Sequence, residues 1–209
     1  MSKQQLKNPK YRSWVKAGLG LKYVKEGLEP FCNDLVKQQH TDILDNVKRK
    51  HGLTTVTCGT CNLRTLQPDH VRIKHAGCPL QQKDCNCQYP KGKILCPNNV
   101  CGAIYDEVIN LHSSRPPCPN WKNTDVTLWC SDPWAIAKCF INAPGYSQKS
   151  TASELDTTAL LHVLINNRGL HKHLSTVITG SDAFSKVFLF SEFSVFIFVM
   201  LEIRRNSKI

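Results

Sequence analysis

The sequence predicts a mainly helical protein in which helical segments flank a cysteine-rich, irregular insertion. Apolar residues recur at three- and four-residue spacing over residues 8–50 and 155–165, which is the pattern of helices with one buried face. Between these segments, eight of the 11 cysteines lie from Cys58 to Cys118, among proline, glycine and asparagine. The 209 residues are 41% apolar and 21% charged, a composition typical of globular chains rather than disordered ones.

Residues 1–53 predict a pair of helices. Asn8 and Pro9 supply an N-cap and a proline at the first helical position, so the first helix should begin there. Pro30 interrupts the apolar pattern and should separate this helix from a second one, which ends at Gly52. The early aromatic residues Tyr11 and Trp14 fall on the apolar stripe, so we expect them in the core rather than on the surface as platforms for stacked bases.

Residues 54–130 form the predicted insertion. They contain few apolar runs and cannot close a conventional core, so some cross-link must hold them together. One helix is expected inside the insertion, from Ala103 to His112, because its apolar residues have helical spacing. His112 lies about 16 Å from Cys101 along such a helix, so the two cannot bind one ion, and we expect His112 on the surface or beside a ligand.

Residues 131–180 predict a return to helix, packed against the N-terminal pair. Ser131-Asp132-Pro133 should open a short helix that ends near Phe140. Thr151 and Glu154 match a capping box before the next apolar stripe. The run Asn166-Asn167-Arg168-Gly169 should then stop the helix.

Residues 181–209 form an apolar tail rich in phenylalanine. Its uninterrupted part, Val187 to Leu201, is 15 residues long and carries Glu192. As a helix it would reach about 22 Å, short of the roughly 30 Å hydrocarbon core of a bilayer. We therefore do not expect a membrane span, although a tail-anchored protein remains an alternative hypothesis.

The cysteines favour zinc over disulfides. The first ten residues contain no apolar run of the kind found in a secretory signal peptide, and an odd number of cysteines does not pair completely. Both observations favour a reducing compartment, the cytoplasm, where clustered thiols usually bind Zn²⁺.

The spacing of the thiols allows two arrangements of ligands around one or two ions. Three close pairs share the chemistry of a zinc knuckle: Cys58 with Cys61, Cys85 with Cys87, and Cys96 with Cys101. In one arrangement, Cys58, Cys61, His75 and Cys78 bind one ion while Cys85, Cys87, Cys96 and Cys101 bind another. In the other arrangement, a single site joins the Cys58/Cys61 pair to the Cys96/Cys101 pair. The first is slightly favoured because it uses every close pair.

The sequence gives no sign of a catalytic metal or of other common catalytic motifs. It lacks HxE followed by PCxxC, the signature of zinc deaminases, and it lacks HExxH. It also lacks a glycine-rich phosphate loop and the GxSxG elbow of hydrolases. A structural zinc and no enzymatic activity are therefore expected.

Three stretches carry a resemblance to a known family: YRSWVKAGLGLKYVKEGL, CNCQYPKGKILCPNNVCGAIYDEVINLH, and WKNTDVTLWCSDPWAIAKCFINAPGY with its Trp129–Lys138 element, WCSDPWAIAK. They resemble a group of uncharacterised animal proteins that includes the product of a human X-chromosome open reading frame. They are also similar to the N-terminal region of a DAZ-interacting zinc-finger ubiquitin ligase. This region is assigned to the HEPN superfamily of helical domains, some of which are ribonucleases and others RNA-binding or interaction modules.

The resemblance covers about residues 8–178 and implies a helical HEPN-like domain. Family members continue into a helix with Arg-Asn-x3-His, the catalytic motif of the ribonucleases, whereas this chain ends in the apolar tail. We therefore expect a truncated or alternatively ended member. Arg168 and His173 match Arg-x4-His, but they lie before the position of the family's motif and include Gly169, so we assign no catalytic residue.

Together these observations predict a non-enzymatic, zinc-stabilised helical module that binds a protein partner or RNA. The resemblance implies a link to ubiquitin or innate-defence signalling. The formal charge of +11 is concentrated at the N-terminus, and five basic residues there are candidates for RNA contacts: Lys3, Lys7, Lys10, Arg12 and Lys16. An RNA-binding relative of the HEPN ribonucleases is the alternative.

Overall fold

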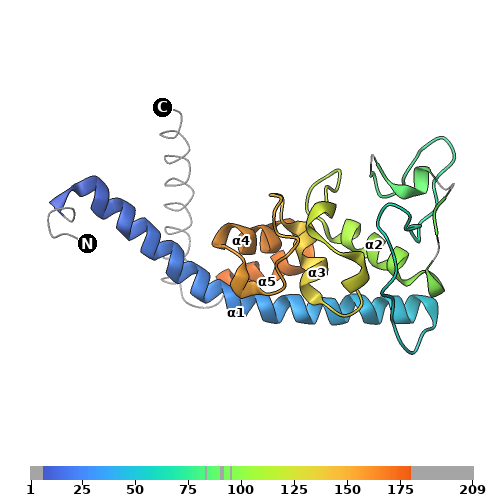
Figure 1. Ribbon diagram of the computed structural model, residues 1–209, viewed down its shortest axis with the longest axis horizontal. Coiled ribbons are helices and arrows are strands. Elements are labelled where there is room, and N and C mark those ends of the chain that lie inside the picture. The colour runs from blue at the N-terminus through green and yellow to red at the C-terminus, as the bar shows by residue number, and fades with distance from the viewer. Residues whose placement is uncertain (1–6, 83, 90–91, 95, 180–209) are drawn as a thin grey trace.

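The computed structural model describes residues 7–82, 84–89, 92–94 and 96–179, and this part of the chain is mainly helical, as predicted. One long helix underlies the molecule, and shorter helices and loops pack along one side of it (Figure 1). The α-helices are α1 Pro9–His51, α2 Val100–Leu111, α3 Pro133–Ala137, α4 Thr157–Asn166 and α5 Arg168–Thr179. Short 3₁₀ turns are η2 Asn86–Gln88, η3 Pro97–Asn99, η4 Trp121–Asn123, η5 Val126–Leu128, η6 Lys138–Phe140 and η7 Ala152–Glu154.

The predicted N-terminal helical pair is wrong, because α1 is a single helix of 43 residues. It begins where predicted, with the Asn8 side chain accepting from the backbone N–H of Lys10 at 2.9 Å, and it ends at Gly52, which is left-handed with φ 64°. Pro30 lies inside it. A proline there removes one backbone hydrogen bond and bends a helix without necessarily ending it, and α1 does bend between its projecting end and the part beneath the other helices (Figure 1).

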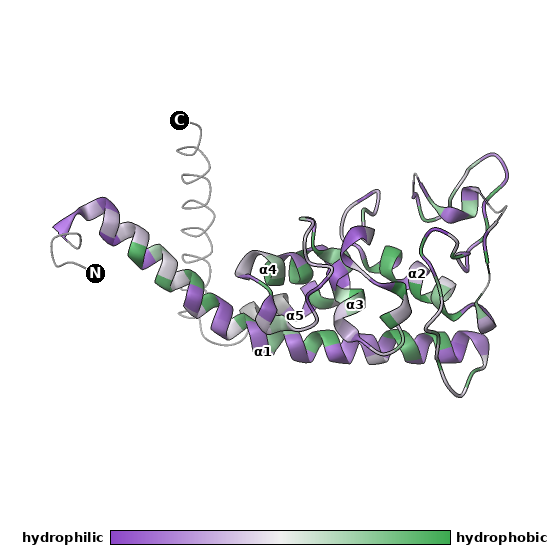
Figure 2. Ribbon diagram, in the orientation of Figure 1, coloured by the Kyte–Doolittle hydropathy of each residue, from purple (hydrophilic) through white to green (hydrophobic). Residues whose placement is uncertain are grey.

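Two clusters of buried side chains lie along α1. One joins the middle of α1, including Val36, to α3, α4 and α5. The other joins the C-terminal part of α1, including Ile43 and Val47, to α2 and the cysteine-rich segment. Figure 2 shows hydrophobic residues of α1 on the side that faces the other helices. The single long helix therefore connects the two cores.

Within the Trp129–Lys138 element, the side chains of Trp134 and Lys138 belong to the interior. Trp134 is buried and donates from its ring N–H to Asn33 of α1 at 3.2 Å. The Lys138 side chain is also buried, and its ammonium donates to the backbone carbonyls of Ser147 and Lys149 at 2.8 and 2.6 Å. Lys138 thus holds the following loop against η6.

The C-terminal helices differ from the prediction in two respects. The capping box of Thr151 and Glu154 is present, but it caps the turn η7, and Asp156 caps α4 by accepting from Ala159 at 2.8 Å. The run that should stop the helix does end α4, yet a further helix, α5, begins immediately at Arg168.

The N-terminal end of α1 extends beyond the other described elements (Figure 1). Among the described residues, hydrogen bonds from this end to the other elements involve Leu21, whose carbonyl accepts from the Thr157 hydroxyl at 3.2 Å, and Lys25, which donates to the Ser153 carbonyl at 2.8 Å. The expectation that Trp14 is a core residue is wrong, because its side chain is 64% exposed. Tyr11 is half-buried beside it.

The cysteine-rich segment is irregular in its described residues, where the only β contacts are isolated bridges such as Leu66 with Ile94. No described helix has the length and apolar character needed to cross a membrane. The apolar tail, residues 181–209, and the candidate RNA contact Lys3 lie outside the described residues.

Candidate metal centre

Eight side chains of the cysteine-rich segment and α2 gather into two groups of potential metal ligands. Within each group, the candidate ligand atoms all lie within 4.8 Å of one another. The four-cysteine cluster consists of Cys58, Cys61, Cys96 and Cys101. The histidine cluster consists of His70, Cys78, Cys85 and Cys87.

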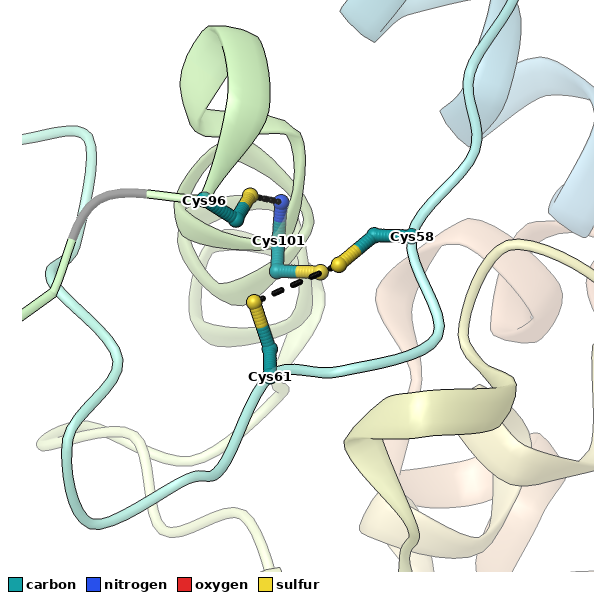
Figure 3. Close-up of side chains that lie close together, drawn as sticks. All are labelled: Cys58, Cys61, Cys96 and Cys101. Carbon is teal, nitrogen blue, oxygen red and sulfur yellow. Dashed lines mark hydrogen bonds between the residues drawn. The ribbon is translucent and has the colours of Figure 1, made fainter.

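The four-cysteine cluster joins a loop after α1 to the start of α2 (Figure 3). The Sγ atoms of Cys58 and Cys61 lie 3.3 Å apart, and the backbone N–H of Cys101 donates to Sγ of Cys96 at 3.2 Å. Cys96 and Cys101 are buried, and the other two are half-buried. An N–H donor stabilises a thiolate sulfur, so this contact favours the form of cysteine that binds a metal.

The loop that carries Cys96 and Cys101 turns sharply by using left-handed residues. Asn98 and Asn99 have φ of 56° and 48°, a conformation that asparagine tolerates better than most residues. The residue after Cys101, Gly102, must be a glycine because a Cβ atom there would overlap the carbonyl of Gln67. This local geometry explains why the pair is separated by four residues and still faces one point.

The histidine cluster depends on an imidazole held in place by α2. Nε2 of His70 lies 3.3 Å from Sγ of both Cys78 and Cys85. Its other ring nitrogen, Nδ1, lies 2.6 Å from Oδ1 of Asp106, and its backbone N–H donates to Oδ2 of the same carboxylate at 2.7 Å. A carboxylate that binds one ring nitrogen and leaves the other facing a ligand group is the usual support of a metal-binding histidine.

An aromatic stack supports the histidine cluster from a second side. The hydroxyl of Tyr105 donates to Sγ of Cys85 at 3.7 Å, and its ring stacks on Trp121 with centroids 4.7 Å apart. Trp121 in turn lies 6.1 Å from the buried ring of Trp129. Helix α2 therefore serves both clusters, with Cys101 in one and Tyr105 and Asp106 beside the other.

The thiols in these clusters differ in acidity. Hydrogen bonds from the Cys101 side chain and backbone lower the pKa of Cys96 to about 5, against burial. Burial raises the pKa of Cys85, but hydrogen bonds from His70, the Cys87 backbone and Tyr105 outweigh it and lower the pKa to about 7. Burial and the hydrogen bond with Cys58 raise the pKa of Cys61 to about 12. Four thiols this close cannot all ionise without a cation among them.

The donor sets fit zinc. Zinc takes four cysteine or histidine ligands in structural sites, with Zn–S near 2.3 Å, so two sulfurs on one ion lie at most about 4.6 Å apart. Both clusters offer four such ligands at close to this spacing, as four sulfurs or as three sulfurs and one imidazole. All 11 cysteines are free thiols, so no disulfide competes for the ligands.

Comparison with known proteins places this architecture in a family. The family described as Domain of unknown function (DUF4559) matches residues 5–179, which is most of the chain. The chain belongs to the DUF4559 family. It is 27% identical over 155 residues to the "Uncharacterized protein CXorf38 homolog" of Mus musculus, a match that covers 74% of this chain and 40% of the mouse protein. The chain thus spans less than half the length of that relative, and no solved structure matches it.

The two arrangements inferred from spacing are each partly right for this DUF4559 chain. Two groups form, as the first arrangement requires, but Cys58 and Cys61 face Cys96 and Cys101, as the second requires. The pairing of Cys85 and Cys87 with the Cys96/Cys101 pair is therefore wrong. Cys78 instead completes the group that contains Cys85 and Cys87.

His75 is not a member of either group, and His70 takes the place expected for it. His75 is exposed in a turn with φ 71°, between Ile73 and Gly77, which form an isolated antiparallel bridge. His70 was missed because no cysteine lies within seven residues of it, so spacing gave no signal. The acidic partner that identifies it, Asp106, is 36 residues away.

The cysteines outside the two groups have different surroundings. Cys130 is half-buried, and a hydrogen bond with the Cys101 side chain, which outweighs burial, lowers its pKa. Cys118 is exposed. Burial alone raises the pKa of Cys32 to about 12, as expected of an inert core thiol.

Other residues singled out in the sequence lie apart from the clusters. The candidate RNA contacts Lys7, Lys10, Arg12 and Lys16 are exposed on or beside the N-terminal end of α1. The guanidinium of Arg168 donates to the backbone carbonyl of Asn110, and His173 lies on the same helix, at an open hollow between α1, α2 and α5.

His112 is neither exposed nor beside a ligand. It is only 2% exposed, and its ring stacks on Phe140 with centroids 5.8 Å apart. Burial and the nearby Arg115 charge lower its pKa, so the ring is neutral in the core. The expectation that it lies on the surface is wrong because the apolar face of α2 continues through its last residue into the core.

Proposed function

We propose that this DUF4559 chain is a non-enzymatic interaction module of the cytoplasm, stabilised by two structural zinc ions, that binds a protein partner or RNA. The observation that carries the proposal is the convergence of eight ligands into two complete groups of four. A cysteine-rich segment with few apolar residues gains a fixed shape from such ions, because metal binding contributes directly to folding. The loops that the zinc ions hold are then available as a recognition surface.

A structural role suits both clusters better than a catalytic one. A catalytic zinc site has three protein ligands and keeps a fourth position open for water or substrate. Each cluster here offers four protein ligands, which fill a tetrahedral shell. The supporting groups also serve to position ligands: Asp106 is engaged twice by His70, so it is not free to act as a general base.

The resemblance to HEPN domains supports an interaction role for the helical part, and its ubiquitin-ligase member suggests a place in ubiquitin or innate-defence signalling. The ribonuclease alternative has less support. Arg168, which matches the catalytic pattern with His173, is already bound to the carbonyl of Asn110. Purified protein should therefore leave single-stranded RNA intact.

Zinc content tests the proposal. The purified chain should carry two zinc ions, measured by mass spectrometry of the metal against protein concentration. Cys61→Ser should remove one ion because it removes a ligand of the four-cysteine cluster, whereas Cys118→Ser should retain both because Cys118 is exposed outside either cluster. A wild-type chain that folds without bound metal would overturn the proposal.

A further inference from the structure

The N-terminal end of α1 leaves large apolar side chains in contact with water. We define residues 9–20 as the arm, because the hydrogen bonds that join this end of α1 to the other described elements begin at Leu21. The residues of the arm are exposed or half-buried, and the arm extends away from the other described helices (Figure 1). Isolated helices of about 12 residues are marginal in water, so the arm should gain stability from a surface that covers it.

The large apolar side chains of the arm lie on one side of the helix. At about 100° per residue, Trp14 and Leu19 lie about 140° apart around the axis. The residues between them on the helix surface are Tyr11, Val15 and Gly18. Trp14 is 64% exposed and Leu19 is 48% exposed, and nothing lies within 4 Å of a Cβ atom at Gly18. The arm therefore has an apolar face, bounded by Trp14 and Leu19, that is open to water.

Positive charge lies along both edges of this apolar face. The charged residues of the arm are Lys10, Arg12 and Lys16, and their side chains are exposed. Lys10 lies about 40° outside the edge formed by Trp14, and Arg12 lies about 20° outside the edge formed by Leu19. Lys16 lies further round on the side of Arg12. The arm thus combines one apolar face with cations on both sides of it.

This arrangement is typical of a helix that lies in the surface of a bilayer. Such a helix buries a face rich in tryptophan and leucine, while lysine and arginine at its sides reach the lipid headgroups. Tryptophan and tyrosine rings are enriched at the depth where headgroups meet acyl chains. From residue 7 to residue 25 the sequence has six basic residues and no acidic one, which suits anionic lipids. A helix of this kind lies on the bilayer without crossing it.

Other partners suit this face less well. The arm is about 18 Å long, so half of its surface is roughly 400 Å², compared with about 800 Å² per partner in a standard protein interface. A second copy of the chain would bring its own cations against Lys10 and Arg12, which costs energy. RNA would contact the cations but would leave the aliphatic side chains of Val15 and Leu19 without a partner.

We propose that the arm binds the surface of membranes that contain anionic phospholipids, with its apolar face inserted and its cations at the headgroups. The proposal goes beyond the interaction role proposed above, because it adds a lipid surface as a ligand. The cytoplasmic leaflet carries anionic lipids, and the free thiols of the two clusters fit the reducing compartment that this leaflet faces. The arm then holds the zinc-supported loops near that surface.

Co-sedimentation of the full-length, zinc-loaded chain with vesicles tests the electrostatic part. The chain should bind vesicles of phosphatidylcholine with one-third phosphatidylserine more tightly than vesicles of phosphatidylcholine alone, and salt should reduce the difference. Lys10→Gln with Lys16→Gln should weaken binding about 30-fold, at about fivefold for each charge near the surface. Lys37→Gln with Lys122→Gln, which removes two exposed charges outside the arm, should leave binding unchanged.

A second set of variants tests insertion of the apolar face. Trp14→Gln should weaken binding about 10- to 150-fold, the range expected when one large apolar side chain is no longer removed from water. Leu19→Gln should also weaken it. Tyr89→Gln is the matched control, because its ring is as exposed as that of Trp14, at 66%, but lies in the cysteine-rich segment.

The fluorescence of Trp14 reports its depth in the bilayer. Trp14 is the exposed one of the four tryptophans. Vesicles with phosphatidylserine should therefore shift the emission to shorter wavelengths, and lipids brominated on the acyl chains should quench it. Trp14→Phe keeps a large apolar ring, so it should retain binding and lose both signals.

Three outcomes would overturn the proposal. These are no binding to vesicles with phosphatidylserine, equal losses in the arm variants and their controls, and an unchanged Trp14 emission on those vesicles. Tighter binding of single-stranded RNA than of vesicles would assign the arm to nucleic acid, and a dimer disrupted by Trp14→Gln would assign it to a second copy. Zinc measured in the same samples separates this proposal from the previous one, because the arm variants should keep both ions whether or not vesicles bind.

Discussion

His70 and His75 have the same side chain and lie five residues apart, yet only one faces the sulfurs. His70 is fixed by two contacts to Asp106, one from its ring and one from its backbone. His75 lies in an exposed turn and belongs to neither cluster. The difference is therefore set by the carboxylate on α2 rather than by distance along the chain to the cysteines.

Replacing each of these two histidines by alanine in turn provides a direct prediction. His70→Ala should lower the zinc content from two ions to one, since three thiols remain in a cluster that needs four ligands. His75→Ala should leave both ions bound. Metal content per chain measures the result, and equal zinc loss in the two variants would contradict the assignment of His70.

The carboxylate of Asp106 yields a second prediction. Asp106→Asn should reduce the affinity of the histidine cluster for zinc by about 10- to 100-fold, because the imidazole loses the anion that orients it and raises its basicity. Glu107→Gln is the control, because Glu107 lies on the same helix and belongs to neither cluster. Competition with a graded chelator measures the affinity. Matching curves for wild type and Asp106→Asn would show that the carboxylate does not support a ligand.

Contacts between residues that are far apart in the sequence decide where some helices end and the next ones begin. Asn167 separates α4 from α5, and its side-chain amide exchanges two hydrogen bonds with that of Gln39 on α1, at 2.7 and 2.9 Å. This pairing allows a new helix to begin directly after the old one. Gly169 lies in the first turn of α5, where a Cβ would overlap Nε2 of Gln39 and crowd Leu111.

A pair of glycine substitutions tests this packing. Gly169→Ala should destabilise the protein by about 1–3 kcal/mol, because the added methyl group must displace the Gln39 amide. Gly20→Ala should increase helix stability by about 0.5–1 kcal/mol, since nothing lies within 4 Å of a Cβ there and alanine is the better helix former. Urea unfolding and far-ultraviolet circular dichroism measure both. A neutral Gly169→Ala would contradict the close approach of α5 to α1.

Local pattern was enough to predict the elements whose periodicity is strong. The helix expected from Ala103 is α2, and the predicted ends of α1 at Asn8 and Gly52 are its caps. The failures have tertiary causes. The bend at Pro30 is tolerated because the helix packs on both sides of it, and α5 follows an apparent stop because Gln39, 128 residues away, pairs with Asn167.

The candidate site was also predicted only in part, because its local features follow from the sequence and its long-range contacts do not. The cysteines in close pairs were identified because a knuckle is a local structure. The way in which pairs combine is set by the path of the chain between them, which spacing does not encode. The Cys96/Cys101 pair faces Cys58 and Cys61 because Leu66 and Ile94 bring the two loops together, with Ile94 donating to Thr65 at 2.7 Å.

The whole molecule consists of two cores with different means of support. The core around α4 and α5 contains none of the candidate ligands and depends on ordinary apolar packing. The core around α2 contains the buried ligands Cys78, Cys85, Cys87, Cys96 and Cys101. Metal loss should therefore affect one core and spare the other, although α1 runs through both.

Zinc removal tests this division. After treatment with a strong chelator under reducing conditions, the described residues between 53 and 99 should lose their protection from hydrogen exchange, and α2 should lose part of it. Helix α4 should keep its protection because its core has no metal ligand. Hydrogen exchange measured by mass spectrometry gives the result by segment. Equal loss of protection in α4 would show one cooperative unit.

The most direct test of the account is X-ray absorption at the zinc edge on the purified protein. We predict a first shell of seven sulfurs and one nitrogen for every two ions, with sulfur at about 2.3 Å and nitrogen at about 2.0–2.1 Å. A shell of four sulfurs alone would show that zinc occupies only the four-cysteine cluster. A shell dominated by oxygen or nitrogen would contradict the central claim that these two clusters are structural zinc sites.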